Sequence, residues 1–521
     1  TILYDSTWPR DFGRGDVTQI GIPIARLCAE AWADPRQRQL LKNIVYVGAL
    51  AWLIEIDMVI LEKLIAEQFK TKPKLVDSNL QALHMGRDWV AEHVGERLPV
   101  RVRKANGTAG TIMMSGNEAA GLGAAFAGAT VAAWYPITPS TSVAEAFERY
   151  ANRFRRNEDG SLNVAVVQAE DELAAVGMAV GANWNGARAF TATSGPGISL
   201  MSEFIGLAYF AEIPLVIYDI QRGGPSTGMP TRTQQSDILA CAFASHGDTR
   251  HVLLIPGDPG ECFTLSADAF DIADRLQTPV FVMSDLDIGM NDWVIDALQW
   301  DDSRRYDRGK VLDADGLEAA RDFARYRDVD GDGIPWRTLP GTHPEKGAYF
   351  TRGTSHTDTG AYTEDGTIHA ATLDRINAKF KTAKRLVPPP VVRTLSTKSR
   401  LGIINYGSTE PAVREALALT MRDGHGLNHM RLRAFPFGRE VIDFIERHDF
   451  LFVVEQNRDA QMRQLLMVEA GAPAEKLVPI TNYDGLPLTA DFIVNAVYAA
   501  LEKNSLVAGA SAPPITTAQR D

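Results

Sequence analysis

Six short apolar segments alternate with helix-forming segments between residues 116 and 287. The expected strands cover residues 130–135, 163–169, 187–193, 214–220, 251–255 and 279–284. Parallel strands need a long crossover to return the chain to the same edge of a sheet, and that crossover is usually a helix. The alternation therefore predicts an α/β fold with a doubly wound parallel sheet.

The rest of the chain divides around this sheet. With 521 residues, about three domains are expected at ~100–200 residues each. Residues 1–100 have mostly helical apolar spacing, residues 293–390 form a polar stretch with little periodicity, and residues 391–507 predict a second α/β unit. Residues 508–521 are expected to form a frayed tail. The chain begins without Met, so we expect a further part before Thr1.

Charge and cysteine content exclude several classes of protein. The sequence has 53 basic and 65 acidic residues, a net charge of −12, which argues against nucleic acid or an anionic membrane as partner. The three cysteines are scattered without a C-x-x-C pair, so a reducing, cytoplasmic location is expected and a Cys₄ iron-sulfur cluster is excluded. Glu55 and Asp57 interrupt the longest apolar run, and no secretory signal is visible.

Two turns follow expected strands and carry polar side chains. Thr138 lies in the turn Tyr135-Pro-Ile-Thr-Pro-Ser140, and Arg222 begins a Gly-Gly-Pro-Ser-Thr loop. The carboxyl ends of parallel strands form the ligand crevice of open α/β sheets. Thr138 offers a hydroxyl there, or Thr138 or Ser140 serves as a helix N-cap. Arg222 either binds a carboxylate with its planar fork or pairs with Asp219 or Asp237.

An acidic cluster follows the second strand and opens a helix of small residues. Glu170, Asp171 and Glu172 are favoured at a helix N-terminus by the macrodipole, which is the simpler interpretation. The alternative is that one carboxylate is buried at the strand end, where a shifted pKa would suit proton transfer. The residues alone favour the simpler interpretation.

Further hydroxyl and glycine residues lie in the same region. Thr227 and Thr231 follow Arg222 and offer an oxygen-binding rim. The loop Ser194-Gly-Pro-Gly-Ile-Ser199 has the form of an anion cradle before a helix, although a tight packing turn explains it equally well.

Two patterns in the polar stretch imitate metal sites. Asp328, Asp330 and Asp332 have the spacing that begins a calcium loop, but the twelfth position is Leu339 rather than Glu. We expect an Asp/Gly turn and leave cation binding open. Gly331-Asp-Gly333 also matches the opening of the magnesium-diphosphate motif of thiamine enzymes, which we reject because no Asn-Asn pair follows.

The three motifs at residues 135–142, 168–172 and 221–231, in this order on one sheet, resemble the alpha subunit of 2-oxoacid:ferredoxin oxidoreductases, particularly the 2-oxoglutarate type. The resemblance implies that residues 1–100 are the end of a fused gamma-type domain. It implies a thiamine diphosphate pyrimidine-type domain at 108–292 and a transketolase C-terminal-like domain at 391–507. Met229 and Ser236 depart from the family pattern of the third motif.

The resemblance also implies roles for individual residues. Glu172 matches the glutamate that hydrogen-bonds N1′ of the cofactor's aminopyrimidine. Thr138 and Arg222 match the residues that hold the carboxylate and keto oxygens of the 2-oxo acid, and Thr227 and Thr231 match further substrate-side threonines. His356 resembles a family motif near the site, and its role stays open.

The implied reaction is oxidative decarboxylation of 2-oxoglutarate with coenzyme A to succinyl-CoA, CO₂ and reduced ferredoxin, or the reverse carboxylation. Mg²⁺, the diphosphate site and the iron-sulfur cluster are then expected on a beta subunit, within an (alpha-beta)₂ assembly. Two alternatives stay open: the same chemistry on pyruvate or another 2-oxo acid, and a non-catalytic docking subunit. Retention of both Glu172 and Arg222 argues against the second.

Overall fold

The computed structural model describes residues 1–320 and 322–503. It divides into two compact units, Thr1–Ala109 and Gly110–Asp521. The predicted tail at residues 508–521 lies outside the described residues. No helix in the described ranges is long and apolar enough to span a membrane.

The first unit combines a pair of strands with helices. Its elements are β1 (Ile2–Asp5), β2 (Gln19–Ile22), α1 (Ile24–Ala31), α2 (Pro35–Leu53), α3 (Met58–Gln68) and α4 (Pro73–His93). Helices α2 and α4 pack closely, because a Cβ on Gly48 would lie 1.9 Å from the Leu83 carbonyl and one on Gly86 1.9 Å from the Val45 carbonyl. The parallel pair β1–β2 was not predicted, because four-residue strands are too short to show a period.

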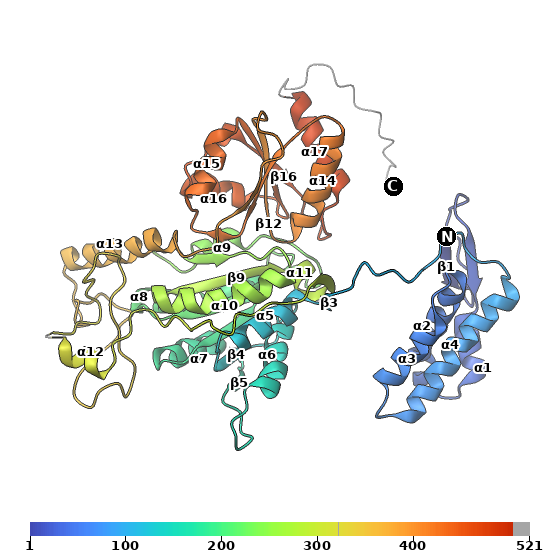
Figure 1. Cartoon of the computed structure of the whole chain (residues 1–521), viewed down its shortest axis with the longest axis horizontal. Helices are drawn as coiled ribbons and strands as arrows, with labels where there is room; N and C mark the ends of the chain where they lie inside the picture. The colour runs from blue at the N-terminus through green and yellow to red at the C-terminus, as the bar shows by residue number, and fades with distance from the viewer. Residues whose placement is uncertain (321, 504–521) are drawn as a thin grey trace. The chain divides into compact units, whose positions relative to one another are not determined.

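A seven-stranded sheet forms the centre of the second unit (Figure 1). Its strands lie in the order β14-β8-β9-β7-β6-β4-β5. Six of them are β4 (Val131–Trp134), β5 (Ala165–Gln168), β6 (Ala189–Thr193), β7 (Leu215–Gln221), β8 (Val252–Leu254) and β9 (Pro279–Asp285). These six pair in parallel, so the predicted doubly wound sheet is confirmed.

Helices cover both faces of this sheet. They are α5 (Gly116–Phe126), α6 (Thr141–Phe154), α7 (Glu172–Trp184), α8 (Gly195–Ala211), α9 (Ile238–Ala242), α10 (Pro259–Leu276) and α11 (Leu286–Met290). Alternate strand residues enter two separate cores: Val216 and Tyr218 pack with α5, α6 and α10, whereas Leu215 and Ile217 pack with α7, α8 and α9. Because both faces of the sheet are buried, these strands are continuous apolar runs in the sequence.

A five-stranded sheet forms the C-terminal part of the second unit. Its order is β11-β13-β12-β15-β16, and only β11 is antiparallel to its neighbour. Its elements are β11 (Val391–Arg393), β12 (Leu401–Tyr406), α14 (Glu410–Arg422), β13 (Asn428–Leu432), α15 (Arg439–Arg447), β15 (Phe450–Glu455), α16 (Gln461–Glu469), β16 (Leu477–Thr481) and α17 (Ala490–Lys503).

The segment 428–435 is divided between the two sheets. Residues up to Leu432 belong to β13, but β14 (Ala434–Phe435) pairs antiparallel with β8 at the edge of the seven-stranded sheet. The period of the sequence cannot show this division, because both pieces are fully buried.

The stretch 293–390 contains more regular structure than its sequence predicts. Strand β10 (Trp293–Asp296) pairs with β3 (Thr111–Met114), and the helices α12 (Ala314–Ala319) and α13 (Gly366–Ala383) follow. The expectation of an irregular insertion is therefore wrong for α13, which has 18 residues. Only Ile376, Lys379, Phe380 and Ala383 of α13 are buried, so its apolar pattern is short.

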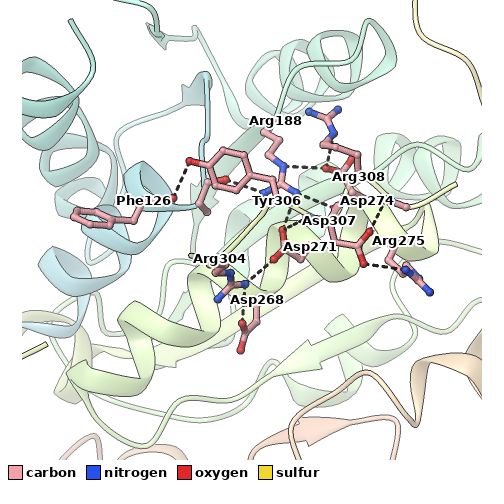
Figure 2. Close-up of polar contacts among 12 residues, drawn as sticks. Phe126, Arg188, Asp268, Asp271, Asp274, Arg275, Arg304, Tyr306, Asp307 and Arg308 are labelled. Atoms are coloured by element: carbon pink, nitrogen blue, oxygen red, sulfur yellow. Dashed lines mark hydrogen bonds and ion pairs between the residues drawn. The ribbon is translucent and has the colours of Figure 1, made fainter. Parts of the chain in front are cut away.

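Buried ion pairs fasten this stretch to the sheet (Figure 2). Asp274 of α10 is 2% exposed and is approached by three arginines. Arg188 Nε lies 3.0 Å from Oδ2 of Asp274, Arg308 Nε lies 3.1 Å from the same oxygen, and Arg337 Nη2 lies 2.7 Å from Oδ1. Arg308 and Arg337 both belong to the polar stretch, so Asp274 anchors it.

A second buried acid anchors α13. Glu212, at the end of α8, is fully buried and pairs with Arg375 and Lys379. These cations hold the pKa of the Glu212 carboxyl well below its usual range against the opposing effect of burial. The position of α13 is thus set by these charge pairs together with the packing of Ile376, Phe380 and Ala383 in the core.

Candidate functional site

The turn after β4 is held by buried hydrogen bonds. Asn117 Nδ2 donates to the Pro139 carbonyl at 2.7 Å and to Ser142 Oγ at 2.9 Å. Ser140 occupies the N-cap position of α6 but makes no side-chain cap. Thr138 itself is exposed just beyond the end of the strand.

The helix-cap interpretation and the buried-carboxylate interpretation of the acidic cluster apply to two neighbouring residues. Asp171 caps α7, because its Oδ1 accepts a hydrogen bond from the Ala174 amide at 2.7 Å. Glu172 is the first residue of the helix and is 7% exposed. No hydrogen bond or ion pair of its carboxylate is found within the described ranges. The cap therefore leaves Glu172 available to a ligand.

Arg222 joins two of the motif loops. Its Nη1 donates to the Thr138 carbonyl at 2.6 Å, and its Nη2 donates to the Thr227 carbonyl at 3.2 Å. The side chain is 7% exposed. Among the described residues, no ion pair joins Arg222 to Asp219 or Asp237. Arg222 thus lies at the carboxyl end of β7 with two backbone carbonyls as its hydrogen-bond partners.

A cleft of about 800 Å³ opens beside Arg222. It is lined by Arg222, Thr227 and Asp237 from the region after β7, by Gly195 and Pro196 at the start of α8, and by Asn457, Arg458, Asp459 and Gln461 after β15. Of the predicted site residues, Arg222 and Thr227 line the cleft. Thr138 is connected to it through its carbonyl, whereas Glu172 and Thr231 are not in its lining.

Sequence analysis did not identify part of this lining. Asn457 and Asp459 were not considered, and Asp237 was named only as a possible partner of Arg222. Ligands bind beyond the carboxyl ends of parallel strands, and this rule applies equally to β15. The loop after Glu455 could therefore have been predicted as part of the site from the sequence. The loop at residues 194–199 contributes Gly195, Pro196 and Ser199.

Two other predicted features lie outside the cleft lining. Lys310 Nζ contacts Asp330 Oδ1 at 2.5 Å and Asp332 Oδ1 at 2.7 Å, so an ammonium group already pairs with two of the three aspartates. His356 is buried and stacks on Tyr326 with ring centroids 3.8 Å apart. His356 belongs to the polar stretch, and its ring lies against Phe210 of α8.

Two family profiles match the chain. A profile described as "Pyruvate flavodoxin/ferredoxin oxidoreductase, thiamine diP-bdg" matches residues 122–304. One described as "Pyruvate ferredoxin/flavodoxin oxidoreductase" matches residues 1–89. A 2-oxoacid:ferredoxin oxidoreductase alpha subunit of Aeropyrum pernix is 33% identical over 500 residues, which cover 92% of this chain and 73% of that protein.

The chain belongs to the alpha subunits of the 2-oxoacid:ferredoxin oxidoreductases. Two further relatives agree. The subunit KorA of 2-oxoglutarate oxidoreductase from Mycobacterium tuberculosis is 30% identical and covers 90% of this chain and 70% of its own length. The 2-oxoglutarate synthase subunit KorA from Methanothermobacter thermautotrophicus is 33% identical and covers 70% and 93%.

A solved structure extends the likeness to three dimensions. The 2-oxoglutarate:ferredoxin oxidoreductase from Magnetococcus marinus, with 2-oxoglutarate, coenzyme A and succinyl-CoA bound, superposes with a TM-score of 0.83 at 29% identity. The match covers 95% of this chain and 83% of that one. As an alpha subunit of a thiamine diphosphate-dependent oxidoreductase, the chain works with a partner subunit and a ferredoxin acceptor.

Gly197 of α8 lies directly beside the side chain of Glu172. A Cβ on Gly197 would lie 1.9 Å from Thr193 Oγ1 and 2.9 Å from Glu172 Cγ. The glycine therefore leaves the space in which Glu172 is seated. The neighbouring Leu173 and Met178 of α7 are exposed at 37% and 46%, which suits contact with an aromatic ring or with the partner subunit.

Replacing Gly197 by alanine is expected to displace Glu172 or Thr193, because the added methyl group overlaps both. We expect cofactor-dependent activity of the oxidoreductase complex to fall about tenfold or more, since a displacement near 1 Å at a catalytic group costs up to ~10²-fold. Gly181→Ala, in α7 with no atom within 4 Å of its Cβ position, is the matched control and should retain activity. Equal activity of the two variants would contradict the role of Gly197.

Proposed function

We propose that this chain, with a beta subunit, catalyses oxidative decarboxylation of 2-oxoglutarate to succinyl-CoA. The observation that carries the proposal is the placement of Arg222. Its buried guanidinium, without an ion-pair partner in the described ranges, lies at a cleft large enough for a dicarboxylate and part of a coenzyme A molecule. The 2-oxoglutarate enzymes named above are similar over most of the chain.

The proposal also assigns the domains as the family resemblance implies. Residues 1–100 are the end of a gamma-type domain, residues 108–292 bind thiamine diphosphate as a pyrimidine-type domain, and residues 391–507 are a transketolase C-terminal-like domain. The two profile matches support the first two parts. The loop 456–459 then brings the third domain to the active site as one wall of the cleft.

The chain's own residues have three tasks in this reaction. Glu172 holds a proton at N1′ of the aminopyrimidine, Arg222 binds a substrate carboxylate, and the hydroxyls of Thr138, Thr227 and Thr231 contact substrate oxygens. When bound, thiamine diphosphate supplies the carbon nucleophile and accepts the electron pair left by CO₂. Those electrons pass to ferredoxin one at a time, and coenzyme A takes the succinyl group.

The partner subunit supplies what this chain lacks. With three cysteines, all buried and free, the chain cannot provide four thiolates to an iron-sulfur cluster. We assign the cluster, Mg²⁺ and the diphosphate site to the beta subunit in an (alpha-beta)₂ assembly. The exposed Leu173 and Met178 of α7 and Leu200 of α8 are suited to that contact.

The test is single-turnover reduction of the complex co-expressed with its beta subunit, followed as bleaching of the iron-sulfur absorbance. Reduction by 2-oxoglutarate at least tenfold faster than by pyruvate supports the assignment. Equal or faster reduction by pyruvate assigns the chain to the pyruvate type. No reduction by any 2-oxo acid, in a complex that has bound thiamine diphosphate, contradicts the catalytic assignment.

Replacing Arg222 by lysine should weaken substrate binding while leaving the fold intact. Lysine keeps the charge but loses the planar fork and the paired hydrogen bonds. A charge-assisted hydrogen bond contributes ~1.5–3 kcal/mol, so KM for 2-oxoglutarate should rise about 10- to 100-fold. Arg458→Lys is the control, because Arg458 is exposed in the same cleft and paired with Asp459. A similar KM for both variants would remove Arg222 from substrate binding.

A further inference from the structure

The Arg222 loop (residues 222–232) starts at the end of β7 and ends against the five-stranded sheet. Directly after the loop, the Thr233 amide donates to the carbonyl of Gly485, which follows β16, at 3.2 Å. The start of the loop is therefore held by the central sheet, and its end is held by the C-terminal part of the second unit.

Gln235 connects these two parts through both its backbone and its side chain. It is buried, and each of its polar groups has a partner. Its amide donates to the Gln456 carbonyl at 2.8 Å, and its Oε1 accepts from the Gln456 amide at 3.2 Å. Its carbonyl accepts from Asn457 Nδ2 at 2.9 Å, and its Nε2 donates to the Tyr406 carbonyl at 3.3 Å. Gln235 is outside the lining of the cleft.

A buried carboxylate completes the surroundings of the Gln235 side chain. Asp285, the last residue of β9, accepts at Oδ2 from Gln235 Nε2 at 3.2 Å and from Ser408 Oγ at 2.5 Å. Ser408 Oγ in turn accepts from Gln456 Nε2 at 2.8 Å. A Cβ on Gly407 would lie 2.7 Å from Gln235 Nε2, so the glycine leaves space for this amide. The network joins residues from both sheets.

The backbone next to Gln235 is linked to Arg222. Gln234 lines the cleft, and its Oε1 accepts from the Gly224 amide inside the loop at 2.9 Å. Arg222 Nη2 donates to the carbonyl of Thr227 in the same loop. The position of the loop backbone therefore decides where the guanidinium of Arg222 lies.

Hydrogen bonds rather than apolar packing hold this loop. Residues 224–232 are exposed, so they bury little surface against the rest of the protein. Segments with few buried apolar contacts open at a low cost in free energy, and the bonds at their ends then decide how often they do. The network around Gln235 supplies such bonds at the end of the Arg222 loop.

We propose that Gln235 is a positioning residue for substrate binding, because its buried amide fixes the end of the Arg222 loop on the five-stranded sheet and so holds the Arg222 guanidinium at the cleft. The inference rests on the proposed function in taking Arg222 as the ligand of a substrate carboxylate. It adds that the C-terminal part of the chain sets the affinity for the 2-oxo acid through a residue that acts on Arg222.

The first arm of the experiment measures hydrogen exchange of the assembled complex without substrate. Gln235→Met keeps the length of the side chain and removes its hydrogen bonds, while the backbone bonds at this position remain. Peptides from residues 222–232 should exchange about tenfold faster than in wild type, because the bond from the Gly223 amide to the Arg232 carbonyl opens more often. Unchanged exchange in this variant would overturn the proposal.

Glu261→Gln is the matched control for this arm. Glu261 of α10 pairs with Arg431 of β13 at 2.6 Å and with Arg433 at 2.8 Å, so it also joins the two sheets. Its ion pairs lead to β13 and not to the Arg222 loop. The variant should lower the unfolding midpoint and leave exchange of residues 222–232 at the wild-type rate. Equal acceleration in both variants would assign the effect to sheet docking in general and overturn the role of Gln235.

The second arm measures KM and kcat for 2-oxoglutarate. In Gln235→Met, KM should rise about tenfold with kcat changed less than about twofold, because Arg222 binds the substrate in the ground state and the transition state alike. In an Arg222→Lys background the same substitution should raise KM less than about twofold, since the planar fork that Gln235 positions is gone. Additive effects on KM would overturn the proposal.

Ser408→Ala tests the same network without altering Gln235. It removes a hydrogen bond from Asp285 and one from Gln456, so exchange of residues 222–232 and KM should rise in the same direction by a smaller factor. If the Gln235→Met complex does not assemble, this variant carries both arms, and wild-type exchange together with wild-type KM would overturn the proposal.

The two arms separate this inference from the proposed function. Faster loop exchange in Gln235→Met with an unchanged KM would overturn the effect of Gln235 on substrate binding. A wild-type KM in Arg222→Lys alone would refute the assigned role of Arg222 and the effect on KM with it, while the exchange arm would still decide whether Gln235 holds the loop.

Discussion

Replacing Glu172 by glutamine is expected to reduce single-turnover reduction of the iron-sulfur cluster by about 10²–10⁴-fold, the usual contribution of a positioned acid–base group. Glutamine has nearly the same shape, but it cannot hold a proton at the aminopyrimidine as a carboxylate does. Burial of Glu172 and the cap supplied by Asp171 indicate that the substitution should leave α7 in place.

The matched control is Glu170→Gln, because Glu170 is an exposed acid two residues earlier. It should reduce the cluster at the wild-type rate. Thiamine diphosphate content and the unfolding midpoint are measured for both variants, so that loss of the cofactor is distinguished from loss of chemistry. A Glu172→Gln complex that loads cofactor and reduces at the wild-type rate would make Glu172 a helix-start acid only.

Replacing Asp274 by alanine is expected to cause the largest loss of stability, about 3–5 kcal/mol in urea unfolding. The substitution would remove the carboxylate that compensates the charges of Arg188, Arg308 and Arg337. Arg188 keeps Asp271 as a partner at 2.7 Å, so complete unfolding is not required. The stretch that contains Arg308 and Arg337 should detach first and become sensitive to protease.

The comparison for this prediction is Asp449→Ala. Asp449 pairs with Arg400 at 2.6 Å, but both side chains are more than half exposed. Exposed pairs contribute ~0–1 kcal/mol, so this variant should unfold near the wild-type urea concentration. If Asp274→Ala and Asp449→Ala lose similar stability, the three-arginine cluster does not anchor the polar stretch.

The central sheet was predictable because its signal is local. Each buried strand is a short apolar run, and each crossover helix has its own period, so the residues between 130 and 285 identify their elements without knowledge of the fold. Helix α13 was missed although Leu373, Ile376, Phe380 and Ala383 have helical spacing, because this short pattern lies within a long polar stretch. Its charge pairs with Glu212, through Arg375 and Lys379, join residues more than 160 positions apart and leave no periodic pattern.

The candidate site was predictable only in part. The loops of Thr138 and Arg222 follow strands, so the sequence placed them at the same edge of the sheet. Their actual connection is a hydrogen bond from Arg222 to a backbone carbonyl, which no residue type specifies. The contribution of Asn457 and Asp459 depends on how the C-terminal domain meets this edge, and that contact is made in tertiary structure.

The pairing of β14 with β8 has a practical consequence for dissecting the protein. Residues 110–290, expressed alone, would lack the segment that closes β8, and would expose the strand edge where the Ile255 amide donates to the Arg433 carbonyl, together with the apolar surface beneath Phe435. A bare, apolar sheet margin promotes self-association. Recombinant fragments should therefore keep residues 434–437 or expect precipitation, and a truncation that stays in solution would need a substitute for them.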